Sequence, residues 1–272
     1  MTDTLPLLIE PNVLRTRLED PHLAVIDLGK DTTYPEIHIP GASHLPYTRI
    51  TAFQHPVYGL LPPPEQLEPL LSGLGIGPDT HVVAYDDEGG GNASRLLWTL
   101  QTLGHNRYSL LNGGLHAWAN EGNPCSRETT SRDTAEFRAQ PDDRGIADTD
   151  YILQRLGSPD LVLWDARSVQ EYQGISRFSQ YSGHIPGAVN LDWVEVMDRQ
   201  ANMRLKPEAD LRSLLTQRGI TPDKEVITYC QTHHRSSLTW FVLHLLGYER
   251  CKGYPGSWSD WGNRHDTPKT QP

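Results

Sequence analysis

The segment Cys230-Gln-Thr-His-His-Arg235 places a thiol five residues before a guanidinium. An apolar run at 226–229 precedes the cysteine and predicts a buried strand, and the amphipathic run 238–246 behind it predicts a helix. A thiol between a strand end and a helix N-terminus faces unpaired N–H groups and a positive partial charge, and both favour the thiolate. Arg235 adds a full positive charge. These residues predict a sulfur nucleophile with a small anion held against it.

The spacing Cys-x-x-x-x-Arg allows the backbone to curl so that successive N–H groups point at the sulfur. The residues expected to bind substrate around the catalytic Cys230 are Gln231, Thr232, His233, His234, Arg235 and Ser236. Cys230 taken without these neighbours also fits a buried, inert cysteine. A metal site formed by Cys230 and the two histidines is disfavoured, because adjacent histidines tend to diverge and no second Cys or His pair stands at zinc-finger spacing.

One internal duplication organises the chain. The pentapeptide His38-Ile-Pro-Gly-Ala42 recurs as His184-Ile-Pro-Gly-Ala188, and each copy follows an apolar run that ends in aspartate. These runs, and the helix-like segments behind the pentapeptides, are 23–27 and 161–165, then 64–74 and 207–215. The run 82–86 matches 226–230, so Asp86 in the first copy stands where Cys230 stands in the second.

Short apolar runs without alternation indicate parallel sheets that are covered on both faces. The expected fold class is α/β, with two tandem domains that each hold a parallel sheet flanked by helices on both faces. We place the domains at 1–122 and 147–272, with a polar linker at 123–146 laid over a domain surface. The polar tail 264–272 is expected to fray.

The first copy continues from Asp86 through Asp87 and Glu88 into Gly89-Gly-Gly91, which we interpret as a longer, acidic loop. It has no thiol, and its carboxylates would repel an anion, so the first domain is predicted to be catalytically silent. A metal site at the three acidic residues is disfavoured, since neighbouring surface carboxylates are usually just solvated. No Gly-Lys-Ser/Thr follows the glycines, so a phosphate loop is weakly supported.

The other chemistry-bearing residues have structural interpretations. His38 and His184 are expected to hydrogen-bond to backbone in a turn. Cys251 is expected to be a small core residue at the start of a short strand, and Cys125 an exposed residue of the linker.

The totals limit the function classes. A net charge of −10 argues against nucleic-acid or membrane-surface binding, which needs clustered Lys and Arg. Three cysteines do not describe a disulfide framework. The N-terminal residues do not resemble a signal peptide, and no apolar stretch is long enough to span a bilayer. We therefore expect a cytoplasmic protein. It is expected to be a monomer, because two domains already supply an interface.

The duplicated Asp…HIPGA…strand–loop–helix…Gly-x-x-x-Trp pattern, over roughly 8–262, resembles the two-domain rhodanese family. The Cys230 loop is similar to that of a bacterial subgroup of its thiosulfate sulfurtransferases. The resemblance implies double-displacement transfer of sulfur from thiosulfate through a Cys230 persulfide to cyanide or a thiol, with no metal or organic cofactor. Arg235 would contact the donor anion, with Arg177 as a second candidate. Asp165 and Trp193 would be structural or line the pocket.

Glu171 lies near the position where eukaryotic members carry a substrate-binding arginine, which is a departure from their pattern. The alternatives left open are a 3-mercaptopyruvate sulfurtransferase and a non-catalytic persulfide carrier for a protein partner. A Cys-based phosphatase or arsenate reductase on the related fold is a further rival. Those loops are one residue longer, which suits a tetrahedral phosphate, whereas the shorter Cys230–Arg235 spacing suits a single sulfur atom.

Overall fold

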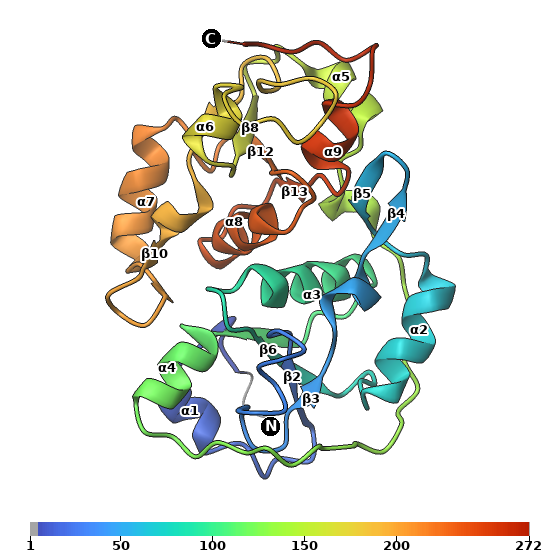
Figure 1. The fold of residues 1–272 in the computed structure, drawn as a ribbon, viewed down its shortest axis with the longest axis vertical. Coiled ribbons are helices and arrows are strands. Elements are labelled where there is room, and N and C mark those ends of the chain that lie inside the picture. Colours follow the sequence, from blue (N-terminus) through green and yellow to red (C-terminus); the bar gives the residue numbers. More distant parts are fainter. Residues whose placement is uncertain (1–4, 272) are drawn as a thin grey trace. The chain divides into compact units, whose positions relative to one another are not determined.

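The computed structural model describes residues 5–271, which form two compact units (Figure 1). Unit 1 comprises Met1–Ile50, Pro62–Asp142 and Asp198–Leu205, and unit 2 comprises Thr51–Leu61, Asp143–Met197 and Lys206–Pro272. Each sequence repeat therefore contributes one segment to the compact unit of the other. The segment that matters for the site is Thr51–Leu61, which comes from the first repeat and belongs to unit 2.

Unit 1 is built on a five-stranded parallel sheet of order β1-β7-β6-β2-β3. Its strands are β1 (Leu8–Ile9), β2 (Leu23–Asp27), β3 (Ser43–His44), β6 (His81–Tyr85) and β7 (Tyr108–Leu111). Its helices are α1 (Pro11–Arg15), η1 (Tyr47–Ile50), α2 (Pro64–Gly73), α3 (Gly91–Thr102) and α4 (Gly114–Asn120). All side chains of β2 and β6 are buried, as the non-alternating apolar pattern predicts.

Helices cover both faces of the unit 1 sheet (Figure 1). On one face, Leu14 of α1 and Trp118 of α4 pack into a core with Val25 and Val83 of the central strands. Helix α3 packs on β6 and β7 and is itself almost wholly buried. The predicted α/β layering is thus confirmed in this half.

Unit 2 repeats the plan with a four-stranded parallel sheet of order β13-β12-β8-β9. Its strands are β8 (Leu161–Asp165), β9 (Val189–Asn190), β12 (Glu225–Tyr229) and β13 (Cys251–Gly253). Its helices are η2 (Asp143–Gly145), α5 (Thr149–Arg155), α6 (Val169–Tyr172), η3 (Trp193–Val196), α7 (Glu208–Gln217), α8 (Arg235–Leu245) and α9 (Ser257–Trp261).

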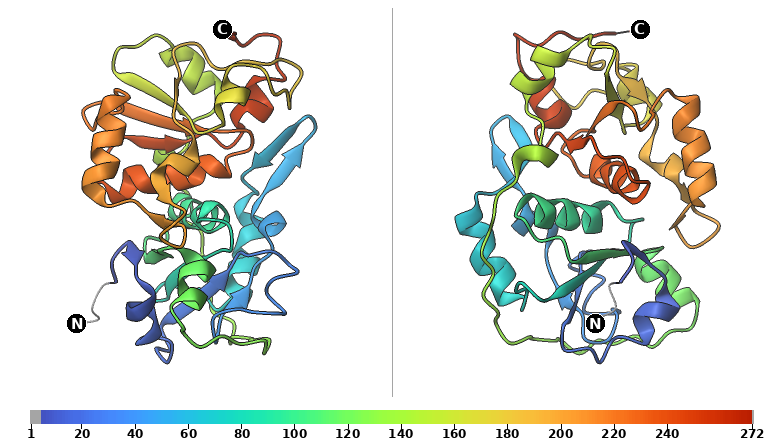
Figure 2. Two further views of the ribbon diagram at one scale, coloured as in Figure 1. Left: turned by 60° about the vertical axis from the view of Figure 1, so that its left-hand side comes forward. Right: turned by 180° about the vertical axis from the view of Figure 1, so that it is seen from behind.

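In unit 2, helices α5 and α9 share one core with the sheet, where Ile152 and Trp258 meet Leu163 and Ile227. Helix α8 packs on β12 and β13, and the views in Figure 2 show it apart from α9. The unit also contains an antiparallel hairpin, β4 (Ala52–Gln54) with β5 (Val57–Leu60), and β5 contacts α9. A further two-stranded sheet joins β10 (Met197–Asp198) and β11 (Arg204–Leu205), and the segment Asp198–Leu205 belongs to unit 1.

The duplicated pentapeptides occupy equivalent turns. His38 pairs through its backbone with Ser126, and His184 pairs in the same way with Thr270. Both imidazoles donate to a backbone carbonyl, His38 Nδ1 to that of Tyr34 over 2.6 Å and His184 Nδ1 to that of Tyr172 over 2.8 Å, which fits their structural interpretation.

The expectation of a frayed tail is wrong for the segment up to Thr270. The backbone of Thr270 makes two hydrogen bonds with His184, of 2.9 and 3.0 Å. Trp261 also donates its indole N–H to the Pro268 carbonyl over 2.7 Å. The polar composition of the tail hid these pairings, because they use backbone groups that carry no sequence signature.

The polar linker lies on unit 1 as far as Asp142, and its last residues, 143–146, belong to unit 2. The Ala135 amide donates to the Ser72 carbonyl, the Gln140 amide to the Leu103 carbonyl, and Phe137 is buried. Among residues 5–271, no helix is long and apolar enough to cross a membrane.

Candidate active site

The side chain of Ser257 holds the loop between β12 and α8. The Ser257 hydroxyl accepts the amide N–H of Cys230 over 3.2 Å and that of His233 over 3.1 Å, and it donates to the Tyr254 carbonyl. Both ends of this arrangement use left-handed backbone, with φ of 53° at His233 and 50° at Ser257. Such conformations cost a β-carbon residue about 1–2 kcal/mol, so the surrounding contacts must hold them in place.

The start of α9 provides a second anchor for the loop. The Trp258 amide donates to the Cys230 carbonyl over 3.0 Å, and the Ser259 amide donates to the Gln231 carbonyl over 2.9 Å. With Ser257, three consecutive residues of α9 fix the loop. The His233 amide donates to Ser257 and not to the sulfur. The expectation that successive loop amides point at the sulfur therefore does not hold for His233.

Cys230 is fully buried, yet its pKa is lower than that of an ordinary thiol. Burial raises the pKa, but the Arg235 charge, the hydroxyl and amide of Ser236, and His234 together outweigh it. The other thiols behave in the opposite way, because burial raises the pKa of Cys125 and raises that of Cys251 to about 12. The thiolate is the reactive form of cysteine, so the three thiols differ sharply in expected reactivity.

Arg235 at the start of α8 forms a two-pronged ion pair with Glu171 of α6. Its two terminal nitrogens lie 2.6 and 2.8 Å from the two carboxylate oxygens. Glu171 is in turn fixed by Ser168, whose hydroxyl and amide both donate to Glu171 Oε2 in a capping box. The ion pair and the Cys230 thiolate raise the pKa of Arg235 against the effect of burial, so the guanidinium stays charged.

The remaining predicted loop residues point in several directions. The Gln231 side-chain amide donates to Ser179 Oγ over 3.1 Å, away from the sulfur. The Thr232 carbonyl lies against Gly59 of the β4–β5 hairpin, where a β-carbon would come within 2.1 Å of it. Gly59 also has a φ of 81°, so this contact requires glycine.

The two histidines of the loop diverge. The His233 ring is buried and lies 2.8 Å from the Ser236 hydroxyl, which in turn acts on Cys230. The His234 ring packs beside Trp193, with ring centroids 5.7 Å apart. Trp193 thus lies beside the loop. Across residues 5–271, no group of three or more His, Cys, Asp or Glu is arranged to hold a metal ion.

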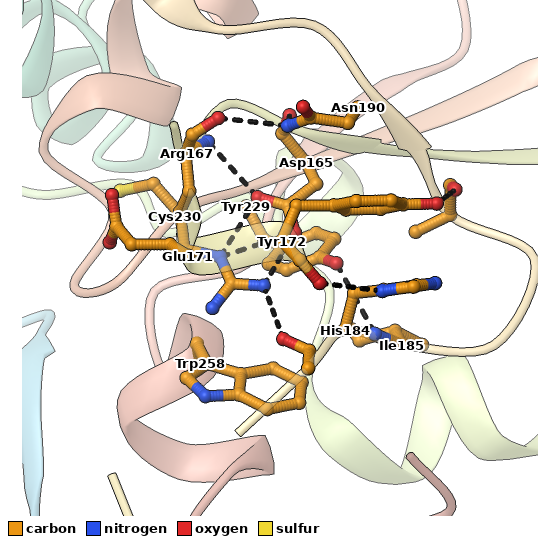
Figure 3. A network of polar contacts seen from close by, with 12 residues as sticks. Asp165, Arg167, Glu171, Tyr172, His184, Ile185, Asn190, Tyr229, Cys230 and Trp258 are labelled. Carbon is orange, nitrogen blue, oxygen red and sulfur yellow. Dashed lines mark hydrogen bonds and ion pairs between the residues drawn. The ribbon is translucent and has the colours of Figure 1, made fainter. Parts of the chain in front are cut away.

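A buried network centred on Asp165 lies next to the loop (Figure 3). Arg167 makes an ion pair with Asp165 at 2.6 Å, donates to the Gly183 carbonyl, and lies over the Trp258 ring. Asp165 therefore has a structural role, as expected. Arg177 donates to the carbonyls of Ser179 and Gln180 in its own exposed segment.

The equivalent loop of unit 1 is filled by its own carboxylate. Asp86 accepts N–H bonds from Glu88 at 3.1 Å, Gly90 at 2.8 Å and Ala93 at 2.9 Å. Burial and Glu88 raise the pKa of Asp86 to about 6, although these three amides favour its ionised form. The expectation of a longer loop is wrong, since α3 begins at Gly91, five residues after Asp86, just as α8 begins five residues after Cys230.

No site role follows from the sequence for three residues that shape the site, namely Ser257, Arg167 and Glu171, of which Glu171 stands out only as a departure from the eukaryotic pattern. Only Glu171 carried a local signal, because Ser168-Val-Gln-Glu171 has the spacing of a capping box. Ser257 reaches the loop from another segment, and it aligns with Gly114 in the first repeat, where no hydroxyl exists. Arg167 pairs with the nearby Asp165, but its other contacts, the Gly183 carbonyl and the Trp258 ring, lie in other segments.

Comparison with known proteins agrees with this geometry. The model for "Rhodanese-like domain" matches residues 10–121 and again 148–264. A "Thiosulfate sulfurtransferase" from Azotobacter vinelandii is 48% identical over 265 residues, which covers 97% of each chain. A "Sulfur carrier protein TtuD" from Thermus thermophilus is 35% identical, covering 96% of this chain and 95% of the relative.

A solved anaerobic ergothioneine biosynthesis enzyme from Chlorobium limicola has the same fold. It superposes with a TM-score of 0.86 and 24% identity, over 97% of this chain and 70% of its own. Fold and site define a tandem α/β protein with one buried, activated thiol. The chain belongs to the rhodanese family.

Proposed function

We propose that this protein is a thiosulfate:cyanide sulfurtransferase that works by double displacement through a persulfide on Cys230. The single observation that carries the proposal is the fully buried Cys230 thiol, whose pKa Arg235 and Ser236 hold below the ordinary value. The relative from A. vinelandii, named a thiosulfate sulfurtransferase, supports thiosulfate as the donor.

In the first half-reaction, the Cys230 thiolate attacks the outer sulfur of thiosulfate. A new S–S bond forms on Cys230, the S–S bond of thiosulfate breaks, and sulfite leaves with the electron pair. Because no proton moves to the leaving group, the step needs a thiolate rather than a general acid. Ser236, through its hydroxyl and amide, stabilises negative charge at the sulfur.

In the second half-reaction, cyanide or a thiolate attacks the terminal sulfur of the persulfide. The S–S bond to Cys230 breaks, the sulfur leaves on the acceptor, and the Cys230 thiolate is restored. The same groups that lower the Cys230 pKa make it a good leaving group here. One electrostatic arrangement therefore serves both half-reactions.

The loop residues have distinct proposed roles. Arg235 supplies positive charge to Cys230 and, through Glu171, ties the start of α8 to α6. His233 orients the Ser236 hydroxyl, while His234 contributes to the charge around the sulfur. Gln231 and Thr232 anchor neighbouring segments.

A persulfide carrier for a protein partner is the second candidate, because one relative is named a sulfur carrier protein. Both candidates load sulfur on Cys230, and they differ in the acceptor. A carrier would take up one sulfur from thiosulfate but turn over cyanide slowly. Single-turnover loading measured beside steady-state cyanide turnover separates the two.

We further propose that residues 1–122 form a catalytically silent domain, since Asp86 fills its loop with a carboxylate. The small-molecule donor and acceptor are proposed to react in a monomeric, cytoplasmic protein. Light scattering of the purified chain tests whether it is a monomer, and fractionation of the cells that produce it tests whether it is cytoplasmic.

The test of the function is substitution of the nucleophile. Cys230→Ser should lower thiosulfate:cyanide turnover by on the order of 10⁴-fold or more, as expected when a nucleophile acts as one unit with its site. Cys125→Ser, at an exposed thiol, is the matched control and should leave turnover unchanged. Turnover that survives in Cys230→Ser would refute the proposal.

A further inference from the structure

The charge that the loop offers to a donor is already neutralised inside the protein. Both terminal nitrogens of Arg235 are used by the two oxygens of Glu171, at 2.6 and 2.8 Å. The Glu171 side chain is 8% exposed and the Arg235 side chain 20%, so water screens this pair only weakly. The Ser168 hydroxyl also donates to Oε2 of this carboxylate.

Two further arginines, Arg177 as the second donor candidate from the sequence and Arg167 in the network beside the loop, are engaged as well. Arg167 is paired with Asp165 and the Gly183 carbonyl, and Arg177 is bonded to carbonyls of its own segment. A planar guanidinium fork is the group that matches a carboxylate best. Among these three arginines, the fork nearest Cys230 is thus occupied by a carboxylate of the protein itself.

The pairing of the Arg235 fork with Glu171 affects the two possible sulfur donors, 3-mercaptopyruvate and thiosulfate, unequally. The carboxylate of 3-mercaptopyruvate concentrates its charge on two coplanar oxygens, which need a bidentate donor to replace lost water. The sulfonate end of thiosulfate spreads its charge over three oxygens in a tetrahedral arrangement, so separate amides, hydroxyls and water can meet it. A site whose arginine fork is occupied therefore disfavours the carboxylate donor more than the sulfonate donor.

Building on the proposed function, we propose that Glu171 is a specificity-determining positioning residue. It withholds the Arg235 fork from donor carboxylates and so sets the preference of the site for thiosulfate over α-keto carboxylate thiols. Glu171 acts through Arg235 and does not itself touch the reacting sulfur.

Glu171→Gln tests the proposal, because it keeps the shape of the side chain and removes its charge. The ratio of kcat/KM for 3-mercaptopyruvate to kcat/KM for thiosulfate should rise about tenfold, mainly through a lower KM for the carboxylate donor, as one recovered charge-assisted hydrogen bond would give. Glu208→Gln removes an equal charge from an exposed pair with Arg212 on α7 and should leave the ratio unchanged.

Glu171→Asp provides the conservative rescue. It keeps the negative charge beside Arg235 and should retain the donor preference of the parent protein, even if its turnover falls. A ratio that stays constant in Glu171→Gln, or that changes equally in Glu171→Gln and Glu171→Asp, overturns the proposal.

A second readout does not depend on sulfur transfer. The pH dependence of Cys230 alkylation by iodoacetamide should shift to lower pH in Glu171→Gln, because Arg235 then faces the thiolate with less of its charge neutralised. A purely structural role for Glu171 would instead loosen Arg235 and shift the profile to higher pH. If the parent protein uses neither donor, the proposed function fails, while this alkylation shift still decides whether Glu171 controls Arg235.

Discussion

The two loops that follow β6 and β12 share one backbone arrangement, which we call the frame, but one holds a carboxylate and the other a thiol. Each leaves a strand at a tyrosine, Tyr85 or Tyr229, whose hydroxyl accepts the isoleucine N–H of its own pentapeptide. Each reaches its helix after the same number of residues. In unit 1 the loop amides bind the carboxylate of Asp86, whereas in unit 2 the loop surrounds Cys230. The duplicated frame therefore accommodates negative charge in both units, and only the second leaves it on a sulfur that can react.

The frame differs between the two units at one position that contacts the loop, which is Gly114 in unit 1 and Ser257 in unit 2. Gly114 and Ser257 have nearly the same left-handed φ, 52° and 50°. A β-carbon on Gly114 would lie 2.4 Å from the Asp86 carbonyl oxygen, so unit 1 requires glycine there. Unit 2 carries serine, and its hydroxyl holds the amides of Cys230 and His233. Where Asp86 satisfies its own loop, the Cys230 loop depends on a hydroxyl from α9.

Exchanging the residues at the two strand ends, Asp86 and Cys230, tests this comparison with the largest expected effect on turnover. Cys230→Asp should abolish thiosulfate:cyanide turnover, by on the order of 10⁴-fold or more, because a carboxylate replaces the nucleophile. Asp86→Cys in the Cys230→Ser background should not restore turnover. The first loop has Gly91 where the second has Arg235, and it keeps Asp87 and Glu88.

The measurement is steady-state production of thiocyanate by the four proteins, including the parent. Substantial turnover in the Asp86→Cys, Cys230→Ser double variant would show that the frame alone is sufficient. It would contradict the view that Arg235 and its surroundings make the difference.

The buried carboxylate of unit 1 makes a prediction about pH and stability. The pKa of Asp86 is raised from 3.8 to about 6, chiefly by burial, so the folded chain binds more protons than the unfolded chain between these values. Stability from this group is therefore greatest at low pH and falls as pH rises from about 4 to 6. The loss should total about 3 kcal/mol in the free energy of unfolding.

Denaturant unfolding of the parent protein and of Asp86→Asn, at pH 4 and at pH 7, measures the contribution of Asp86 to the free energy of unfolding. The parent should lose about 2 kcal/mol more than the variant between the two pH values, since asparagine does not titrate and Asp86 in the unfolded chain is already more than half ionised at pH 4. A parent protein that gains stability relative to Asp86→Asn over this range would show that the three loop amides dominate over burial.

Ser257 allows a smaller and finer test. Ser257→Ala leaves two buried amides without their acceptor and should cost about 2 kcal/mol of stability and roughly tenfold in kcat/KM. Ser257→Gly loses the same hydroxyl but relieves the left-handed strain, so it should be about 1 kcal/mol more stable than Ser257→Ala. Thermal unfolding and donor kinetics of both variants provide the comparison. Equal stability of the two would argue against strain at this position.

Much of the fold followed from the sequence because the repeat shows each element twice. The strands ending in Asp27 and Asp165 and the helix behind Cys230 form as expected. The loop of unit 1 was misjudged, because α3 begins directly after the left-handed Gly90 and three glycines in a row suggest a loop. A glycine at a helix start gives no side-chain capping signal.

The site itself was only partly predictable. Cys230, Arg235 and Ser236 lie together because they are neighbours in sequence and share one helix start. Glu171 and Ser257 reach the loop from 64 and 27 residues away, so no local pattern could place them at the loop, although the capping-box spacing of Ser168 and Glu171 is visible in the sequence. The contact of Gly59 with Thr232 joins residues of the two repeats, because Thr51–Leu61 belongs to unit 2, and no local sequence pattern indicates this exchange.

Mass spectrometry of the protein after incubation with thiosulfate tests the central claim most directly. The account predicts a gain of one sulfur on the peptide that contains Cys230, no gain on the peptides of Cys125 and Cys251, and loss of that sulfur when cyanide is added. An unmodified Cys230 in a protein that still turns over thiosulfate, or sulfur carried on Cys125 alone, would contradict it.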